Sequence, residues 1–156
     1  MITFVTAPAA TVSTHATPNS ETDHLRFLTA ASKGAFIKKL GLGGQGANLT
    51  AIHGIRVRGY RYSTPSTSGG AITPRSRTTP AATAILTAFT APSVGTTATI
   101  QFAGFCGAAG PGGWQALNRD SFVQLDANGG ANGNLDLLSS SGFAALTFEY
   151  DVEHEE

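Results

Sequence analysis

The stretch that decides the fold lies near the C-terminus and runs Leu146-Thr147-Phe148-Glu149-Tyr150-Asp151-Val152-Glu153. Apolar and polar side chains alternate strictly along it. In an extended strand successive side chains point to opposite faces, so this pattern puts every apolar residue on one side, whereas a helix would scatter them. The stretch therefore predicts a β-strand with one buried and one wet face. It indicates a β-protein that is closed by this last strand.

The composition of the chain also favours a β-protein with a single domain. Its 156 residues include 19 glycines and 7 prolines, and only 13% are charged. Glycine and proline favour turns, and strong helix formers such as Glu, Lys, Gln and Met are scarce. A chain of this length can bury about two-thirds of its unfolded surface around one core. We therefore expect a β-sandwich or barrel. No apolar run approaches the roughly 18 residues that a membrane-spanning helix needs.

The charges cancel overall but are segregated along the chain. All 10 Lys and Arg residues lie between Arg26 and Arg119, whereas no acid lies between Asp23 and Asp120. One interpretation is that basic strands lie beside acidic ones within the fold, where opposite cross-strand charges stabilise by about 0.2–1 kcal/mol. The other is a polar subunit, basic on one surface and acidic on another, that packs against copies of itself or a charged partner.

The N-terminal part of the chain predicts little core. Residues 1–19 carry Thr-Ala repeats broken by prolines, which predicts an extended N-terminal arm, ordered against a neighbour, before a single domain at residues 20–156. A frayed terminus or a simple edge strand is the alternative. From Ser20 an N-cap followed by Asp23 predicts a helix or turn, although the residues after it also fit a short strand.

The charged and aromatic side chains of two strands are the candidates for contact with a partner. In residues 51–62, apolar residues alternate with arginines and tyrosines, which share the other face. Arginine contacts phosphate and tyrosine stacks on bases, but a nucleic-acid-binding domain normally carries a net positive charge, and this chain is neutral. We expect this face to lie against the acidic face of residues 147–153 or a neighbouring subunit. Two further arginines stand in an expected loop at residues 63–79, where they can contact an acidic partner. The candidate interface residues are Arg56, Arg58, Tyr60, Tyr62, Arg75, Arg77, Glu149, Asp151 and Glu153.

The remaining motifs carry little chemistry. Gly43-Gly44-Gln45-Gly46 lacks the Gly-Lys-Ser/Thr ending of a phosphate loop, so we expect a hairpin turn there. Residues 126–134 are only loosely similar to a calcium loop, because Leu137 stands where an EF-hand needs Glu, and a hairpin loop is again expected. The single cysteine, Cys106, is expected to be buried as a small apolar group. Residues 104–114 are too glycine-rich for a strand interior and predict a turn that delivers Trp114 to the core or an interface.

In the first strand of the main domain, at residues 35–42, we expect Phe36 to point inward, together with Leu40 and Leu42, and Lys39 to point outward. No nucleophile has a neighbouring base that the sequence identifies, and the histidines show no ligand spacing. We therefore expect no catalytic residue, no metal and no cofactor.

Several segments, in this order, resemble a group of tailed-bacteriophage virion proteins and their prophage relatives. The resemblance covers roughly residues 33–156, leaves out the N-terminal arm, and lies in the order of weak motifs rather than in any one of them. The segments are Phe36-Ile37-Lys38-Lys39-Leu40-Gly41-Leu42-Gly43-Gly44, Gly54-Ile55-Arg56-Val57-Arg58, Gly69-Gly70-Ala71-Ile72-Thr73-Pro74, Gly110-Pro111-Gly112-Gly113-Trp114, and the Ser-Gly start and Glu-Glu end of the last strand. The resemblance implies a jelly-roll-like antiparallel β-sandwich on the outside of a capsid or tail, often as a trimer, with no catalytic residues.

These expectations together describe a structural protein of the virion, assembled in the host cytoplasm, that acts as a capsid decoration or cement protein. Its expected partners are copies of itself and a major capsid protein or another virion protein, with no membrane and no direct nucleic-acid contact. The alternative is a phage tail or head-fibre module that binds a host-surface carbohydrate. Such a site would use exposed aromatic side chains, for which Tyr60, Tyr62 and Trp114 are the candidates.

Overall fold

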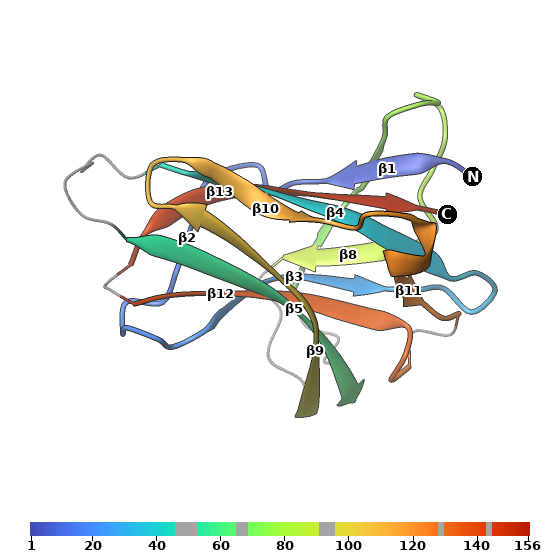
Figure 1. Ribbon diagram of the computed structural model, residues 1–156. Helices are drawn as coiled ribbons and strands as arrows, with labels where there is room; N and C mark the ends of the chain where they lie inside the picture. The colour runs from blue at the N-terminus through green and yellow to red at the C-terminus, as the bar shows by residue number, and fades with distance from the viewer. Residues whose placement is uncertain (46–52, 65–68, 91–95, 128–129, 143–144) are drawn as a thin grey trace.

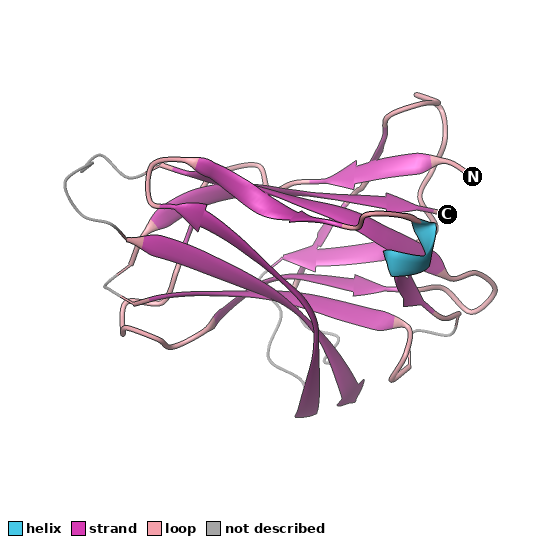
Figure 2. Cartoon of the chain, viewed as in Figure 1, coloured by secondary structure: helices cyan, strands magenta, loops and turns pink. Residues whose placement is uncertain are grey.

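The structure, a computed structural model, describes residues 1–45, 53–64, 69–90, 96–127, 130–142 and 145–156. Apart from one short 3-10 turn, η1 (Arg119–Ser121), the regular structure of these residues is β-strand, as Figure 2 shows. The strands are β1 (Thr3–Thr6), β2 (Val12–Ser13), β3 (Thr22–Leu28), β4 (Ala35–Gly44), β5 (Gly54–Thr64), β6 (Gly70–Ile72), β7 (Arg75–Ser76), β8 (Thr87–Thr90), β9 (Thr96–Gly107), β10 (Pro111–Gln115), β11 (Val123–Leu125), β12 (Asn134–Ser141) and β13 (Thr147–Glu155).

The described strands form one antiparallel sheet that folds over on itself. Its order is β6-β8-β3-β12-β5-β9-β10-β4-β13-β1-β7, with β11 beside β4 and β2 beside β13. Figure 1 shows β1, β13, β4 and β10 in one layer and β8, β3, β12 and β5 in the layer opposite. The predicted fold class, an all-β, jelly-roll-like antiparallel β-sandwich, is confirmed.

The two ends of this sheet come together along the chain. The outermost strands, β6 and β7, are separated in sequence only by Thr73 and Pro74. The expected loop at residues 63–79 therefore contains two short strands, and the chain passes between the layers at a proline, which cannot donate to a sheet ladder.

The core lies between the two layers. Leu25 of β3 and Leu137 of β12 are no more than 1% exposed, and so are Leu40 of β4 and Val152 of β13 in the facing layer. Side chains of the two layers also meet directly, since the rings of Phe27 and His154 lie 5.6 Å apart. Burying one such apolar side chain contributes about 1.5–3 kcal/mol, so this interior is the main source of stability.

Strand β13 keeps the alternation that the sequence predicts. Phe148, Tyr150 and Val152 are buried, whereas Glu149 between them is exposed. The strand does not close the sheet, however, because β13 pairs with β4 on one side and with β1 and β2 on the other. The alternation identified the strand and its faces, but its central position depends on neighbours from the other end of the chain.

A register shift changes the inward face of β4. Glu153 pairs with Lys39 and His154 pairs with Ile37, so Lys38 is an extra residue on β4. The extra residue lets Ile37 and Leu40 face the core although they are three positions apart. The expectation for Leu40, Leu42 and Lys39 is confirmed. The expectation that Phe36 points inward is wrong, because Ile37 is fully buried instead.

The helix or turn expected after Ser20 is wrong, because this segment forms strand β3. It pairs with β12 and β8, and a register shift opposite Leu137 and Leu138 makes His24 its extra residue. Partners on both sides satisfy the backbone hydrogen bonds, which outweighs a local capping signal.

Residues 1–19 are extended, as predicted, and they lie against the chain's own sheet. Strand β1 pairs with both β13 and β7, and Phe4 is 1% exposed and stacks on the ring of His154. Thr14 is buried and receives the backbone N–H of Leu146. This segment therefore contributes to the core, contrary to the expectation that little of it could.

The glycine-rich segment at residues 104–114 is a β-hairpin rather than an irregular turn. Gly112 and Gly113 of β10 pair with Cys106 and Phe105 of β9, so the expectation that this composition excludes a strand is wrong. Gly113 has φ +139° and an added Cβ would overlap the carbonyl oxygen of Leu40. Glycine is needed here because the backbones of β10 and β4 approach too closely for a side chain.

Candidate interaction surfaces

The arginines and tyrosines of β5 share one face, as the alternation predicts, but the chain itself covers much of it. Arg58 forms an ion pair with Glu21 at 3.1 Å, and the Tyr60 hydroxyl donates to the same carboxylate at 2.8 Å. Tyr60 and Tyr62 are only 8% and 3% exposed. Neither tyrosine ring is therefore open for stacking on a base or a sugar in this conformation.

Arg56 lies at the other end of this face, opposite Ser140 of β12 and Phe105 of β9. Its Nη2 is 3.4 Å from the Ser140 hydroxyl. Together with Asn19 and Ser141, these residues line a hollow of about 230 Å³. The Phe105 ring beside this hollow is 60% exposed.

The acidic residues of β13 lie in the opposite layer. Glu149 is exposed, Asp151 is half-buried, and Glu153 is buried among basic side chains. Arg77 reaches the Glu153 carboxylate at 2.8 Å, and Lys39 lies 3.7 Å from the same oxygen. Glu153 and Lys39 are also direct cross-strand partners. The interpretation that basic strands lie beside acidic ones within the fold is thus confirmed for β4 and β13.

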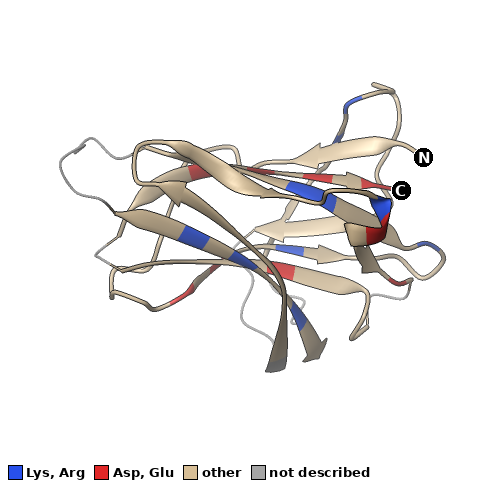
Figure 3. Cartoon of the chain, in the orientation of Figure 1, with Lys and Arg blue, Asp and Glu red and all other residues tan. Residues whose placement is uncertain are grey.

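The nine candidate residues do not form one surface. Figure 3 shows the basic positions of β5 in one layer and the acidic positions of β13 in the other. The expected contact between these two faces is wrong, because Arg58 pairs with Glu21 while Glu153 pairs with Arg77 and Lys39. Arg75 is exposed on the short strand β7, beside Val5 of β1. The other interpretation, contact of these faces with a neighbouring subunit, stays a prediction.

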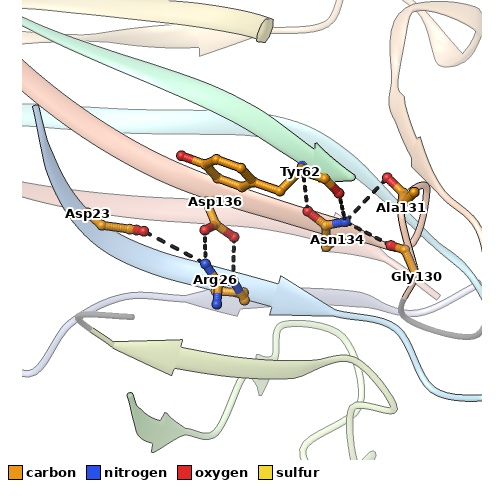
Figure 4. A network of polar contacts seen from close by, with 7 residues as sticks. All are labelled: Asp23, Arg26, Tyr62, Gly130, Ala131, Asn134 and Asp136. Atoms are coloured by element: carbon orange, nitrogen blue, oxygen red, sulfur yellow. Dashed lines mark hydrogen bonds and ion pairs between the residues drawn. The ribbon is translucent and has the colours of Figure 1, made fainter. Parts of the chain in front are cut away.

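The most strongly built polar group in the described residues is one that the sequence did not single out. Arg26 of β3 is fully buried and donates from Nε to Asp136 of β12 at 2.6 Å and from Nη2 to the second oxygen of the same carboxylate. Asp23 lies 3.8 Å from the same Nη2. Figure 4 shows the two carboxylates around one guanidinium, all on neighbouring strands.

Burial dominates the electrostatics of this group. Burial first, and then the nearby Asp136 carboxylate, raise the pKa of Asp23 to about 8, although Arg26 opposes the rise. Burial also raises the pKa of Asp136, against the lowering effect of its hydrogen bonds from Arg26. A buried site that holds one cation favours one negative charge rather than two, so Asp23 is the carboxyl that keeps its proton. Next to it, burial lowers the pKa of His24 to about 4, which keeps that imidazole neutral.

A second polar contact extends the ladder between β12 and β5. The side-chain amide of Asn134 accepts from the Tyr62 N–H at 2.9 Å and donates to the Tyr62 carbonyl at 2.8 Å. It also donates to the Gly130 carbonyl at 2.8 Å (Figure 4). The amide thus takes the place of a backbone partner where β12 begins, which fixes the register of these two strands.

The sequence contains a signal for the buried group, although a weak one. Arg26 stands between Leu25 and Phe27, and Asp136 stands between Leu135 and Leu137. A lone charge between two core residues falls on the opposite face of its strand, and that face is normally wet. The residues around Arg26 and Asp136 do not indicate that this face is buried, so only the tertiary structure could show that the two charges are in contact.

Trp114 and Cys106 are both placed near the core. The Trp114 ring stacks on Phe102 with centroids 4.3 Å apart, and this pair lies where β9 and β10 separate. Cys106 is 7% exposed, and burial raises the pKa of its thiol. The expectation of a buried cysteine is confirmed. Trp114 is half-buried against the core, which is one of its two predicted places.

An uncharged segment contains three of the large apolar side chains that are exposed in the described part of the chain. Between Arg77 and Arg119 the chain has no Asp, Glu, Lys, Arg or His. In the described part of the chain, the large apolar side chains that are exposed are Met1, Ile100, Phe105 and Leu117. Ile100, Phe105 and Leu117 belong to this segment, with exposures of 52%, 60% and 96%. Contiguous exposed apolar patches are typical of surfaces that bind another protein, which makes this segment the candidate for such a surface.

The described residues contain no group of three or more His, Cys, Asp or Glu side chains placed to hold a metal ion. Within the same residues, no helix is long and apolar enough to cross a membrane. The expected turns at Gly46 and at Asn128 fall partly outside the described residues. Comparison with protein-family models found no match, and comparisons with curated proteins and with solved structures found no significant match.

Proposed function

We propose that this protein is a structural component of a bacteriophage particle, a capsid decoration protein that stabilises the shell through contacts between subunits. The observation that carries the proposal is the uncharged segment at residues 78–118, which exposes Ile100, Phe105 and Leu117. Apolar side chains in water favour association, because burying them removes about 25 cal/mol per Å² of unfavourable hydration. The resemblance of several segments, in order, to phage virion proteins supports a phage particle as the setting.

The charged surfaces suit the same role. Glu149 and Arg75 are exposed. Surface charges of this kind set orientation and association rate more than affinity, so they would align a subunit on a particle that the apolar surface then holds. The partners are copies of this chain and a major capsid protein or other virion protein.

The test is the composition and image of the particle itself. Particles are purified from a lysate that carries the gene for this chain, washed at high salt, and analysed by mass spectrometry and electron cryo-microscopy. We expect the chain at a fixed copy number per capsid, with density for a β-sandwich on the outer surface. Its absence from washed particles would contradict the proposal, and density on the tail alone would contradict the capsid assignment.

A second candidate function, carbohydrate binding by a tail or head-fibre module, rests on the hollow beside Phe105. The tyrosines expected to stack on a sugar are buried, but this hollow offers an exposed ring next to Arg56, Asn19 and Ser140. An apolar wall with a few polar groups is the usual form of a ligand site. A glycan array probed with the wild type and with Phe105→Ala tests it. Signals that survive the substitution, or no signals at all, would remove this candidate.

A further inference from the structure

Among the described residues, strand β9 has a free edge over part of its length. From Ala98 to Ala103 its ladder partner is β5, and its other neighbour, β10, pairs only with Phe105 and Cys106 among the described residues. Figure 1 shows β5 and β9 running together beyond the remaining strands at this end. Every second residue of such an edge turns its N–H and C=O groups away from the one partner strand, where they can pair with another chain.

This edge has neither charge nor proline, two of the features that normally prevent sheets from joining, although it contains one β-bulge at Gln101. Natural edge strands are short or carry lysine, proline or inward-pointing charges. The two end strands of this sheet follow that rule, because β6 and β7 have three and two residues and are joined through Pro74. Strand β9 is 12 residues long and contains neither charge nor proline. One register irregularity, opposite Gly59 and Tyr60, interrupts it.

The charge pattern indicates which partner fits. An added strand with charged residues would have to place them beside uncharged ones, with no opposite charge to pair with. A second copy of β9 avoids this cost, because neither strand of the pair carries a charged residue. It also brings an Ile100 that is half exposed in the monomer, and two such side chains can cover each other.

We propose that two copies of this chain associate through their β9 edges. The two strands run antiparallel about a two-fold axis near Thr99, and they join the two sheets into one. In this arrangement Ile100 lies opposite Ala98 of the second copy, and the two Ile100 side chains are diagonal neighbours, about 7–8 Å apart. The contact is isologous, so the same patch serves both subunits and the assembly closes as a dimer. This inference deepens the proposed function by naming one subunit contact.

The test compares two matched pairs of substitutions in the full chain. Ala98→Lys/Ile100→Lys puts lysines on the free edge at two exposed positions. Ala109→Lys/Ala131→Lys adds the same charge at exposed positions of the β9–β10 turn and of the turn before β12. Mass is measured by light scattering during size-exclusion chromatography over a concentration series, and circular dichroism checks that each variant is folded.

We expect a wild-type dimer, a self-association at least about tenfold weaker for Ala98→Lys/Ile100→Lys, and an unchanged dimer for Ala109→Lys/Ala131→Lys. Mixing the edge-lysine variant with Ala98→Glu/Ile100→Glu should restore a heterodimer, because opposite charges then face each other. A wild-type monomer at the highest soluble concentration, a trimer, or a dimer that both lysine pairs affect equally would overturn the inference. Particle composition tests the proposed function separately. A dimer that is absent from particles would contradict the proposed function but not the β9 contact. A monomer that is present in particles would contradict the β9 contact but not the proposed function.

Discussion

The two carboxylates around Arg26 give the sharpest prediction for this protein. Asp136 accepts two hydrogen bonds from the buried guanidinium, and Asp23 lies 3.8 Å from one of its nitrogens. Asp136→Asn removes the better-placed negative charge. Asp23→Asn/Asp136→Asn removes both carboxyl groups, so neither position can pair with the arginine as an anion, and the arginine stays between the same strands.

The magnitude follows from what each variant leaves behind. In Asp136→Asn the repulsion that helps to raise the pKa of Asp23 disappears, so Asp23 can ionise and take over part of the pairing with Arg26. We therefore expect a loss of about 1–3 kcal/mol, the value of hydrogen bonds to a charged group. The double variant takes both carboxylates from a buried cation and should cost about 3–5 kcal/mol. In a chain of this length that lowers Tm by roughly 6–20 °C.

The same site predicts a dependence of stability on pH. Folded Asp23, with its pKa raised to about 8, keeps a proton that an unfolded aspartic acid loses near pH 4. The free energy of unfolding should therefore fall as pH rises from about 4 to about 8, because over that range the unfolded state releases the proton and the folded state does not. Above about pH 8 this contribution is constant. In Asp23→Asn the decline should be smaller.

Urea denaturation at pH 4 to 8, followed by Trp114 fluorescence and circular dichroism, measures both effects. Asp120→Asn is the control, since Asp120 is exposed on η1 and its loss should change stability by no more than about 0.5 kcal/mol. Equal stability of the double variant and this control would refute the argument for a buried ion network. So would a wild-type stability that rises steadily from pH 5 to pH 8 and is matched by Asp23→Asn, because the raised pKa would then have no effect on folding.

Two further predictions concern single residues in or beside the sheet. Gly113→Ala should destabilise the protein by about 1–3 kcal/mol, because its φ of +139° and the Leu40 carbonyl oxygen leave no room for a side chain. Gly43→Ala, where an added Cβ meets nothing within 4 Å, is its control, and equal denaturation midpoints would contradict the account of β10. Glu156 accepts hydrogen bonds from the backbone N–H groups of Ile85 and Leu86 at 2.7 and 2.8 Å. Burial alone would raise the pKa of Glu156, but its hydrogen bonds with His154 and these amides lower it. Glu156→Gln should therefore lower the free energy of unfolding by about 1–2 kcal/mol at pH 7. The difference in stability between wild type and variant should shrink as pH falls below about 4.5, because first the unfolded and then the folded carboxylate takes up a proton. A difference in urea midpoint that does not change with pH would contradict this prediction.

Much of the sheet could be predicted from the sequence, because the alternation of apolar and polar residues identifies the two faces of a strand. The alternation of residues 146–153 identified β13 and its buried face. The same periodicity placed Arg56, Arg58, Tyr60 and Tyr62 on one face of β5. The charge segregation predicted that basic strands would lie beside acidic ones, which holds for β4 and β13, but it did not predict which strands would pair. These features depend on neighbours in the chain or on charge sign alone.

What only the tertiary structure decided was which faces are covered and by what. The extra residue at Lys38 exchanged Phe36 for Ile37 in the core, and it arises from pairing with a strand more than a hundred residues away. Arg26 and Asp136 meet in a buried pair because β3 and β12 are neighbours, although each alone resembles an ordinary outward-facing charge. Local periodicity reports the direction of a side chain, whereas its burial depends on strands that the rest of the chain brings beside it.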